Sequence, residues 1–221
     1  MTDEMCTPEE MFALPLTQQV KRITAVRESL TTNLIDDQCV LAGVLQPCDK
    51  GADFLCSNTN YLWWFSAGTI FRPRSIAEIG TRYGYSLWAI TQGADLLPQE
   101  AVLWAFDNDS DPTPTLDVFE ASFASRGFKN VHVNRSDTQK LDALPIPYRV
   151  DLGVVDGLHS EAGVYHDLGL MMGVVKAGGI ILVDDTNPGE VRRGCERFCH
   201  ENGLEFAFVS TYRGMHIVRV K

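Results

Sequence analysis

The chain has 221 residues, of which 45% are apolar and 22% charged, as expected for one globular domain of ordinary size. Its formal net charge of −10 comes without any Lys/Arg cluster, which disfavours nucleic acid and membranes as partners. The six cysteines form no C-x-x-C pair, and residues 1–30 contain no long apolar run. We therefore expect reduced thiols, no targeting or membrane segment, and a cytoplasmic location.

The N-terminal part of the chain is predicted to be helical or irregular. Thr17–Leu30 places apolar residues at helical spacing, with charged residues between them. Gln46–Asn60 is rich in turn-forming residues and is predicted to be a loop, whereas the aromatic stretch Asn60–Ile70 favours a helix. We expect residues 1–60 to form an extension that serves as a lid or as a contact in a homodimer, and residues 61–221 to form the main domain.

After Pro73 the apolar pattern alternates between strands and helices. Strands are predicted at Ser75–Ile79, Ala101–Phe106, Asn130–Val133, Val150–Val155, Gly179–Val183, Leu204–Ser210 and Met215–Val220, and helices at Tyr85–Gly93, Leu116–Arg126, Ser160–Lys176 and Glu190–Asn202. Such alternation predicts an α/β fold, a doubly wound parallel sheet with helices on both faces. The turn between the last two strands is too short for a parallel crossover, so the sheet should end in an antiparallel hairpin.

A glycine-rich turn, EIGTRYGYS (Glu78–Ser86), joins the first predicted strand to its helix. Glycines let the backbone approach a ligand closely at the positive end of a helix. Gly80 and Gly84 follow the spacing G-x-x-x-G, not the G-x-G-x-x-G of dinucleotide sites. The carboxylate of Glu78 suits a ligand that carries an ammonium or sulfonium group better than one that carries phosphates. Asp107, at the end of the second strand, can accept hydrogen bonds from ribose hydroxyls.

Acidic residues also follow the fourth and fifth predicted strands, at Asp156 and at Asp184-Asp185. In an open α/β sheet the ligand crevice lies outside the carboxyl ends of the strands, where the strand order reverses. Three clustered carboxylates repel one another unless a cation is present, and oxygen ligands suit Mg²⁺ or another hard divalent cation. Alternatively, these acids only occupy helix N-termini, where carboxylates are favoured.

His159 follows Asp156 by three residues and can accept a proton near neutral pH, with a solvent-facing helix residue as the alternative. The third predicted strand leads to Ser136 and Asp137, where contacts to an adenine edge would fall; both residue types also suit a helix N-cap.

The segment IAEIGTRYGYS, followed by an acid after the second strand, resembles motif I and its partner in class I S-adenosylmethionine (SAM)-dependent methyltransferases. The similarity is greatest to the metal-dependent, catechol O-methyltransferase-like branch of small-molecule O-methyltransferases, and it covers residues 70–221. It implies a Rossmann-like sheet of seven strands with the last strand antiparallel. By this resemblance, SAM contacts Glu78, Gly80, Thr81, Gly84, Ser86, Asp107, Ser136 and Asp137, and a divalent metal is bound by Asp156, Asp184 and Asp185.

Two positions depart from the catechol enzymes. The pair Asp184-Asp185 replaces their Asp-Asn and resembles some sugar O-methyltransferases, and His159 stands where they have a lysine base. The resemblance therefore implies a SAM-dependent, metal-assisted O-methyltransferase that acts on a hydroxyl of a small molecule, such as a natural product or sugar, with His159 and Asp156 as catalytic residues. The alternatives are the same fold used for another tailoring reaction such as hydroxylation, and a non-catalytic subunit that binds SAM or a nucleotide.

Overall fold

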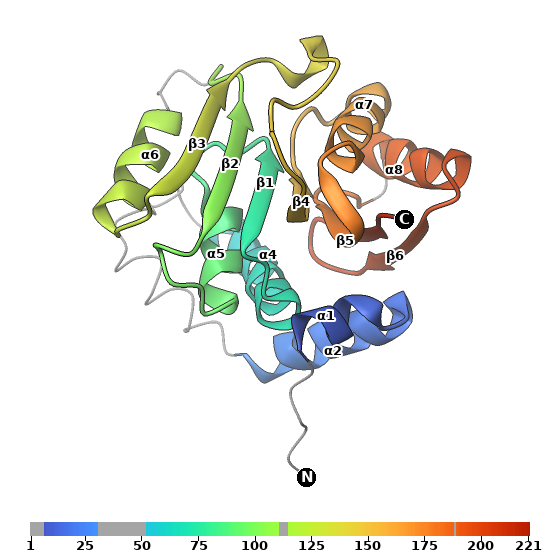
Figure 1. Ribbon diagram of the computed structural model, residues 1–221. Coiled ribbons are helices and arrows are strands. Elements are labelled where there is room, and N and C mark those ends of the chain that lie inside the picture. The colour runs from blue at the N-terminus through green and yellow to red at the C-terminus, as the bar shows by residue number, and fades with distance from the viewer. Residues whose placement is uncertain (1–6, 31–51, 111–114, 188) are drawn as a thin grey trace.

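A seven-stranded sheet with the strand order β3-β2-β1-β4-β5-β7-β6 forms the centre of the molecule. The computed structural model describes residues 7–30, 52–110, 115–187 and 189–221 (Figure 1). The strands are β1 (Ser75–Ile79), β2 (Val102–Asp107), β3 (Asn130–Arg135), β4 (Val150–Val155), β5 (Val175–Val183), β6 (Glu205–Val209) and β7 (Met215–Arg219). Neighbouring strands are parallel except that β7 runs antiparallel to both β5 and β6, which confirms the predicted fold class.

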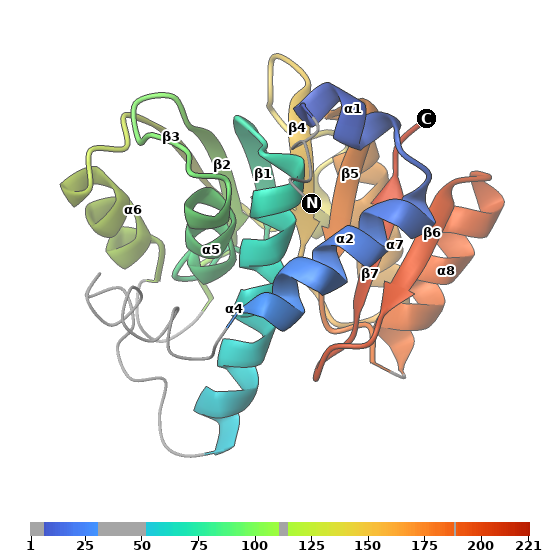
Figure 2. The same ribbon diagram turned by 90° about the horizontal axis from the view of Figure 1, so that it is seen from below.

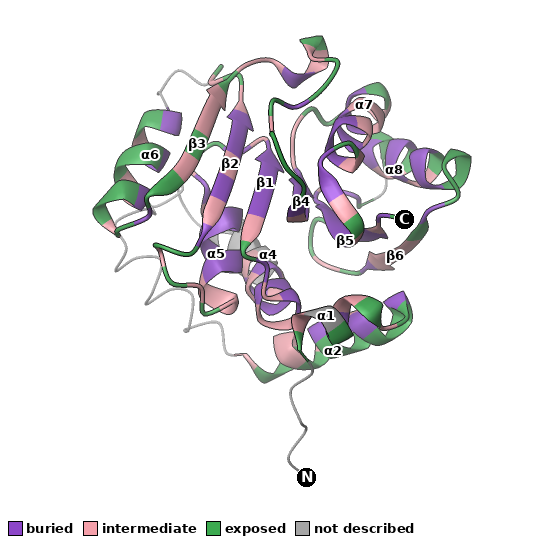
Figure 3. Ribbon diagram, in the orientation of Figure 1, coloured by how far each residue is buried: buried purple, intermediate pink, exposed green. Residues whose placement is uncertain are grey.

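Helices cover both faces of this sheet, and Figure 3 shows that the central strands are almost wholly buried between them. The helices are α1 (Pro8–Ala13), α2 (Leu16–Ser29), α4 (Ala52–Phe71), α5 (Tyr85–Gly93), α6 (Thr115–Ser125), α7 (Glu161–Met172) and α8 (Glu190–Glu201), with a short 3₁₀ turn, η1 (Thr138–Lys140). Side chains of α1, α2, α4, α5 and α6 share one apolar core, and those of α7 and α8 form the second. In the described part of the chain, no helix is long and apolar enough to cross a membrane.

Two predicted boundaries are wrong. Helix α4 begins at Ala52, so most of the loop predicted at Gln46–Asn60 is helical. The helix is stabilised by tertiary packing, because Gly68 lies directly against the backbone carbonyl of Ile90 in α5. Strand β5 begins at Val175, inside the predicted helix Ser160–Lys176. It begins there because Val175 pairs with Val150 of β4; the register between the two strands then shifts before Leu152.

The described part of the N-terminal extension packs onto the sheet near β5, β7 and β6 (Figure 2). Leu16 is fully buried in the same core as the central strands, and its backbone N–H donates to Glu205 at 3.2 Å. The guanidinium of Arg219 donates to the backbone carbonyl of Leu14. Residues 7–29 thus complete the main core. The role as a lid or dimer contact stays a prediction, and residues 31–51 lie outside the described part of the chain.

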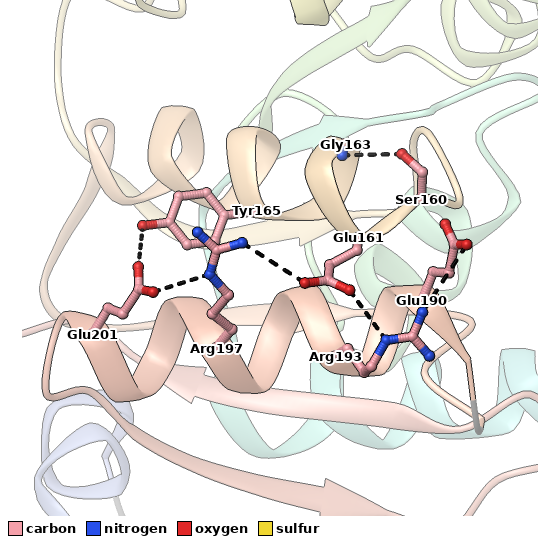
Figure 4. Close-up of polar contacts among 8 residues, drawn as sticks. All are labelled: Ser160, Glu161, Gly163, Tyr165, Glu190, Arg193, Arg197 and Glu201. Atoms are coloured by element: carbon pink, nitrogen blue, oxygen red, sulfur yellow. Dashed lines mark hydrogen bonds and ion pairs between the residues drawn. The ribbon is translucent and has the colours of Figure 1, made fainter.

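The loop after β4 is held in place by the start of α7 and its contacts with α8 (Figure 4). Ser160 caps α7, because its hydroxyl oxygen accepts the backbone N–H of Gly163 at 3.1 Å. In the first turn of α7, Glu161 pairs with Arg193 at 3.1 Å and with Arg197 at 3.7 Å, both from α8. Exposed ion pairs each contribute little, but the cap and the paired helices together fix where α7 begins.

Candidate functional site

The loops after β1 and β4 touch at the carboxyl edge of the sheet. Gly80 has a φ of +86°, and a Cβ added there would lie 1.8 Å from the backbone carbonyl oxygen of Asp156. The Asp156 N–H in turn donates to the carbonyl of Ile79 at 2.9 Å. Gly84, with a φ of +75°, packs equally closely on the ring of Phe119. The two glycines are therefore required for this close approach, and Gly80 brings Asp156 beside the glycine loop.

Glu78 is a buried carboxyl just beneath this loop. The hydroxyl of Ser86 donates to its Oε1, while its Oε2 finds no hydrogen-bond partner among the described residues. Burial raises the pKa of Glu78 well above its usual range, and the nearby carboxylate of Asp156 raises it further, against the lowering effect of Ser86. A buried acid with an unpaired oxygen is suited to a cationic ligand.

A cavity of about 540 Å³, here called the larger cavity, opens between the ends of β1, β2, β3 and β4. Its walls include Gly80, Asp107, Ser136, Asp137, Thr138, Gln139, Asp156, Gly157 and Leu158. Asp107 is held in position because its carboxylate accepts the backbone N–H groups of Arg82 at 2.9 Å and of Asp109 at 2.8 Å. Asp137 caps η1 by accepting the N–H of Gln139 at 3.1 Å, so it has a capping role and also lines the cavity.

A second cavity of about 160 Å³, the smaller cavity, shares Gly80, Arg82 and Asp156 with the larger one. Its other walls include the polar residues Thr81, Ser86 and Asp184. They also include the guanidinium of Arg213 and four aromatic residues, which are Tyr61, Trp64, Tyr83 and Tyr85. Sequence reasoning missed Arg213. The turn that carries it reaches the site because Gly214, at φ +78°, packs against the backbone of Asn187 in the loop after β5.

Three side chains with metal-ligating atoms meet at Asp156, which lines both cavities, whereas His159 and Asp185 line neither. The Nε2 of His159 lies 3.2 Å from an oxygen of Asp185 and 3.5 Å from one of Asp156, and the ligand atoms of all three lie within 4.8 Å of one another. The guanidinium of Arg213 is 3.6 Å from Asp185. Asp184 is adjacent and almost wholly buried, but it is not part of this close group.

The charges in this cluster influence one another's protonation. Burial raises the pKa values of Asp156 and Asp184, and in both cases a neighbouring carboxylate raises the pKa further. The hydrogen-bonded carboxylate of Asp156 raises the pKa of the His159 imidazole above its ordinary value, although burial opposes this shift. The cluster therefore has an excess of acidic groups, which His159 and Arg213 balance in part, and a further cation would stabilise the charged carboxylates.

Comparison with known proteins identifies the fold and the family. The family model described as a methyltransferase domain matches residues 77–186, about half of the chain, from β1 to the acidic pair after β5. A search of curated proteins finds no match. A SAH-bound methyltransferase of Podospora anserina shares 18% identity over 94% of this chain and 98% of its own, with a TM-score of 0.60.

Two solved structures described as O-methyltransferases have the same fold. The enzyme from Bacillus cereus, in complex with SAH, shares 15% identity over 94% of this chain and 100% of its own, with a TM-score of 0.59. TomG from Streptomyces achromogenes, in complex with SAM, shares 17% identity over 87% of this chain and 91% of its own, with a TM-score of 0.54. From the family match and the shared fold, the chain belongs to the class I SAM-dependent methyltransferases.

Proposed function

We propose that this enzyme transfers the methyl group of SAM to a hydroxyl of a small molecule with the assistance of a divalent cation. The observation that carries the proposal is the position of Asp156. It lines both cavities and also belongs to the cluster with His159 and Asp185. A methyl donor that reaches from the larger cavity into the smaller one would therefore present its methyl group beside a group of acids and a base. The O-methyltransferases of the same fold support this reaction.

In this proposal the adenosine of SAM occupies the larger cavity, and the methionine end extends toward the smaller one. Asp107 would accept the ribose hydroxyls, and Ser136 with Asp137 would contact the adenine. The methionine end would lie along the glycine loop, against Gly80, Thr81 and Ser86, while Gly84 lines neither cavity and would act by shaping the loop. The buried carboxyl of Glu78 lies behind Ser86 and would balance the positive charge of the ligand.

The Asp107→Ala variant tests this placement of SAM. We expect SAM affinity to fall by about 1.5–3 kcal/mol, because the substitution removes hydrogen bonds to a charged group. Isothermal calorimetry on the purified variant measures the change. Asp117→Ala is the matched control: it removes an equal charge from an exposed position on α6 and should leave the affinity unchanged. An Asp107→Ala variant that binds SAM as tightly as the wild type would remove this residue from the site.

The donor set of the acidic cluster fits a divalent cation. Asp156 and Asp185 would hold it, and Asp184 or His159 would complete the protein ligands. Carboxylate oxygens favour Mg²⁺, and a histidine nitrogen in the set would favour a transition metal. A bound cation would lower the pKa of the acceptor hydroxyl and orient its oxygen.

His159 is the proposed base. In the proposed reaction the acceptor oxygen would take the methyl group from the sulfur of SAM, which would leave S-adenosylhomocysteine, and the imidazole of His159 would accept the hydroxyl proton. Asp156 and Asp185 orient the imidazole, since both approach this nitrogen within 3.5 Å. The aromatic walls of the smaller cavity would exclude water from the charged reactants.

Incubation with SAM, Mg²⁺ and a panel of hydroxylated small molecules tests the reaction itself. We expect a methyl ether and one equivalent of S-adenosylhomocysteine, detected by mass spectrometry. A hydroxylated product would instead support a repurposed fold. Tight binding of SAM without turnover of any acceptor in the panel would support the non-catalytic alternative.

A further inference from the structure

Helix α7 carries a buried carboxylate that the proposed reaction leaves without a role. Asp167 is fully buried and lies behind the wall of the larger cavity, not in it. Its Oδ1 accepts two hydrogen bonds of 2.8 Å, one from the hydroxyl of Thr138 and one from the side-chain amide of Gln139. Both donors belong to η1 and line the larger cavity. Asp167 therefore contacts the wall that follows β3.

The second oxygen of Asp167 faces the opposite wall. A Cβ added to Gly157 would lie 2.7 Å from Oδ2 of Asp167, so the carboxylate occupies the space directly behind this glycine. Oδ2 itself has no hydrogen-bond partner among the described residues, so the carboxylate meets this wall by packing alone. Gly157 and Leu158 line the larger cavity as well. One carboxylate thus holds the wall after β3 by hydrogen bonds and packs directly behind the wall after β4.

The chemistry of Asp167 suits a group that holds other residues in place. Burial raises the pKa of Asp167 to about 6, but the hydrogen bond from Thr138 opposes the shift, so the group is mostly ionised at neutral pH. Hydrogen bonds to an ionised acceptor are stronger and more directional than those between neutral groups. An apolar side chain could fill the same volume without the free-energy cost of removing a carboxylate from water. Such a side chain could not accept the hydrogen bonds that restrain Thr138 and Gln139.

We propose that Asp167 is a positioning residue for the adenine end of SAM. It sets the separation between the Thr138–Gln139 wall and the Gly157–Leu158 wall, and so pre-forms the slot that the adenine enters. This inference rests on the proposed placement of the adenosine in the larger cavity. Asp167 would act through its neighbours, without contact to the reacting atoms.

Steady-state kinetics of Asp167→Ala distinguish a role in positioning the cavity walls from a general contribution to the stability of the fold. We expect the KM for SAM and the calorimetric Kd for S-adenosylhomocysteine to rise about tenfold, because buried donors on the cavity wall lose their acceptor. The kcat at saturating SAM should stay within about twofold, since bound ligand restores the wall. Asp167→Asn should recover most of the affinity, because its amide oxygen can accept the same hydrogen bonds.

Asp151→Ala is the matched control. Asp151 is a partly buried carboxylate that likewise holds two segments together, accepting the backbone N–H groups of Arg74 at 2.8 Å and Ser75 at 2.9 Å. It lies at the amino end of the strands, away from both cavities. This variant should lower the melting temperature without changing the KM for SAM. The proposal is overturned if Asp167→Ala changes the KM no more than Asp151→Ala does.

A double-mutant cycle covers the case in which Asp167→Ala does not fold. Asp167→Leu, which fills a similar volume without an acceptor, and Thr138→Val should weaken SAM binding by less together than the sum of their separate effects, because each removes the same contact. Fully additive effects would overturn the proposal. The Asp107→Ala variant distinguishes a wrong placement of the adenosine from a wrong role for Asp167. If Asp107→Ala has no effect, the adenosine lies elsewhere and the proposal fails with its premise; if only Asp107→Ala weakens binding, the role of Asp167 alone is rejected.

Discussion

Turnover by the Asp156→Ala variant is expected to fall to the background rate while SAM still binds. Asp156 belongs to the group that would hold the divalent cation, and its loss leaves Asp185 and His159 without their third partner. Excess chelator should have the same effect on the wild type, and added Mg²⁺ should restore its activity but not that of the variant. Product formation is measured by mass spectrometry and SAM binding by calorimetry.

Asp117→Ala is again the matched control, because it makes the same change in charge on the exposed face of α6. Its activity should equal that of the wild type and should remain sensitive to chelator. Full wild-type activity in excess chelator would contradict the proposed metal site. In that case the acidic cluster would serve to orient His159 and Arg213, and the reaction would depend on a base alone.

The His159→Ala variant should lower kcat by on the order of 10²–10⁴, with little change in SAM affinity, because general-base catalysis contributes that much. The base must be unprotonated to act, and the Asp156 carboxylate raises the pKa of His159 above its ordinary value. The wild-type rate should therefore rise with pH through the pKa of His159, and a cation bound to Asp156 would offset the raising effect of that carboxylate. This acidic limb should flatten in the variant.

Metal affinity distinguishes a base from a ligand at this position. If His159 is the base, the variant should bind Mg²⁺ as the wild type does; if it is a metal ligand, affinity and rate should fall together. His132→Ala provides a control, since His132 is exposed on β3, stacks on Trp104 of the neighbouring β2 and lines neither cavity. A His159→Ala variant that keeps its kcat and pH profile would transfer the role of base to Asp156.

The sequence predicted regular, strongly patterned elements well. The bounds of β1, α5 and β4 agree with the prediction, because their patterns end at glycines or polar residues. The start of β5 was missed because Val174 and Val175 suit both a helix and a strand, and only the pairing with Val150 decides between them. Helix α1 was also missed, although Thr7 and Glu10 form a capping box that marks its start.

The candidate site was predictable wherever a residue follows a strand. The carboxyl ends of parallel strands converge, so Asp107, Asp156 and Asp185 could be assigned to one crevice from chain order alone. Arg213 and Asp167 could not, since neither belongs to a motif at a strand end. Arg213 reaches the cluster through a turn between antiparallel strands, and Asp167 reaches the larger cavity from inside a helix. Only tertiary structure specifies such positions.

The contact between Leu14 and Arg219 joins residues 205 positions apart in the chain. During synthesis α1 and α2 leave the ribosome before the strands on which they dock. The apolar side chains of Met11, Leu16 and Ile23 can pack against α4 early, but their contacts on the sheet are completed only when β6 and β7 emerge. Contacts between such distant segments form slowly and leave apolar surface exposed in the meantime. The nascent chain is consequently expected to need chaperone protection at its N-terminus for as long as translation of the domain continues.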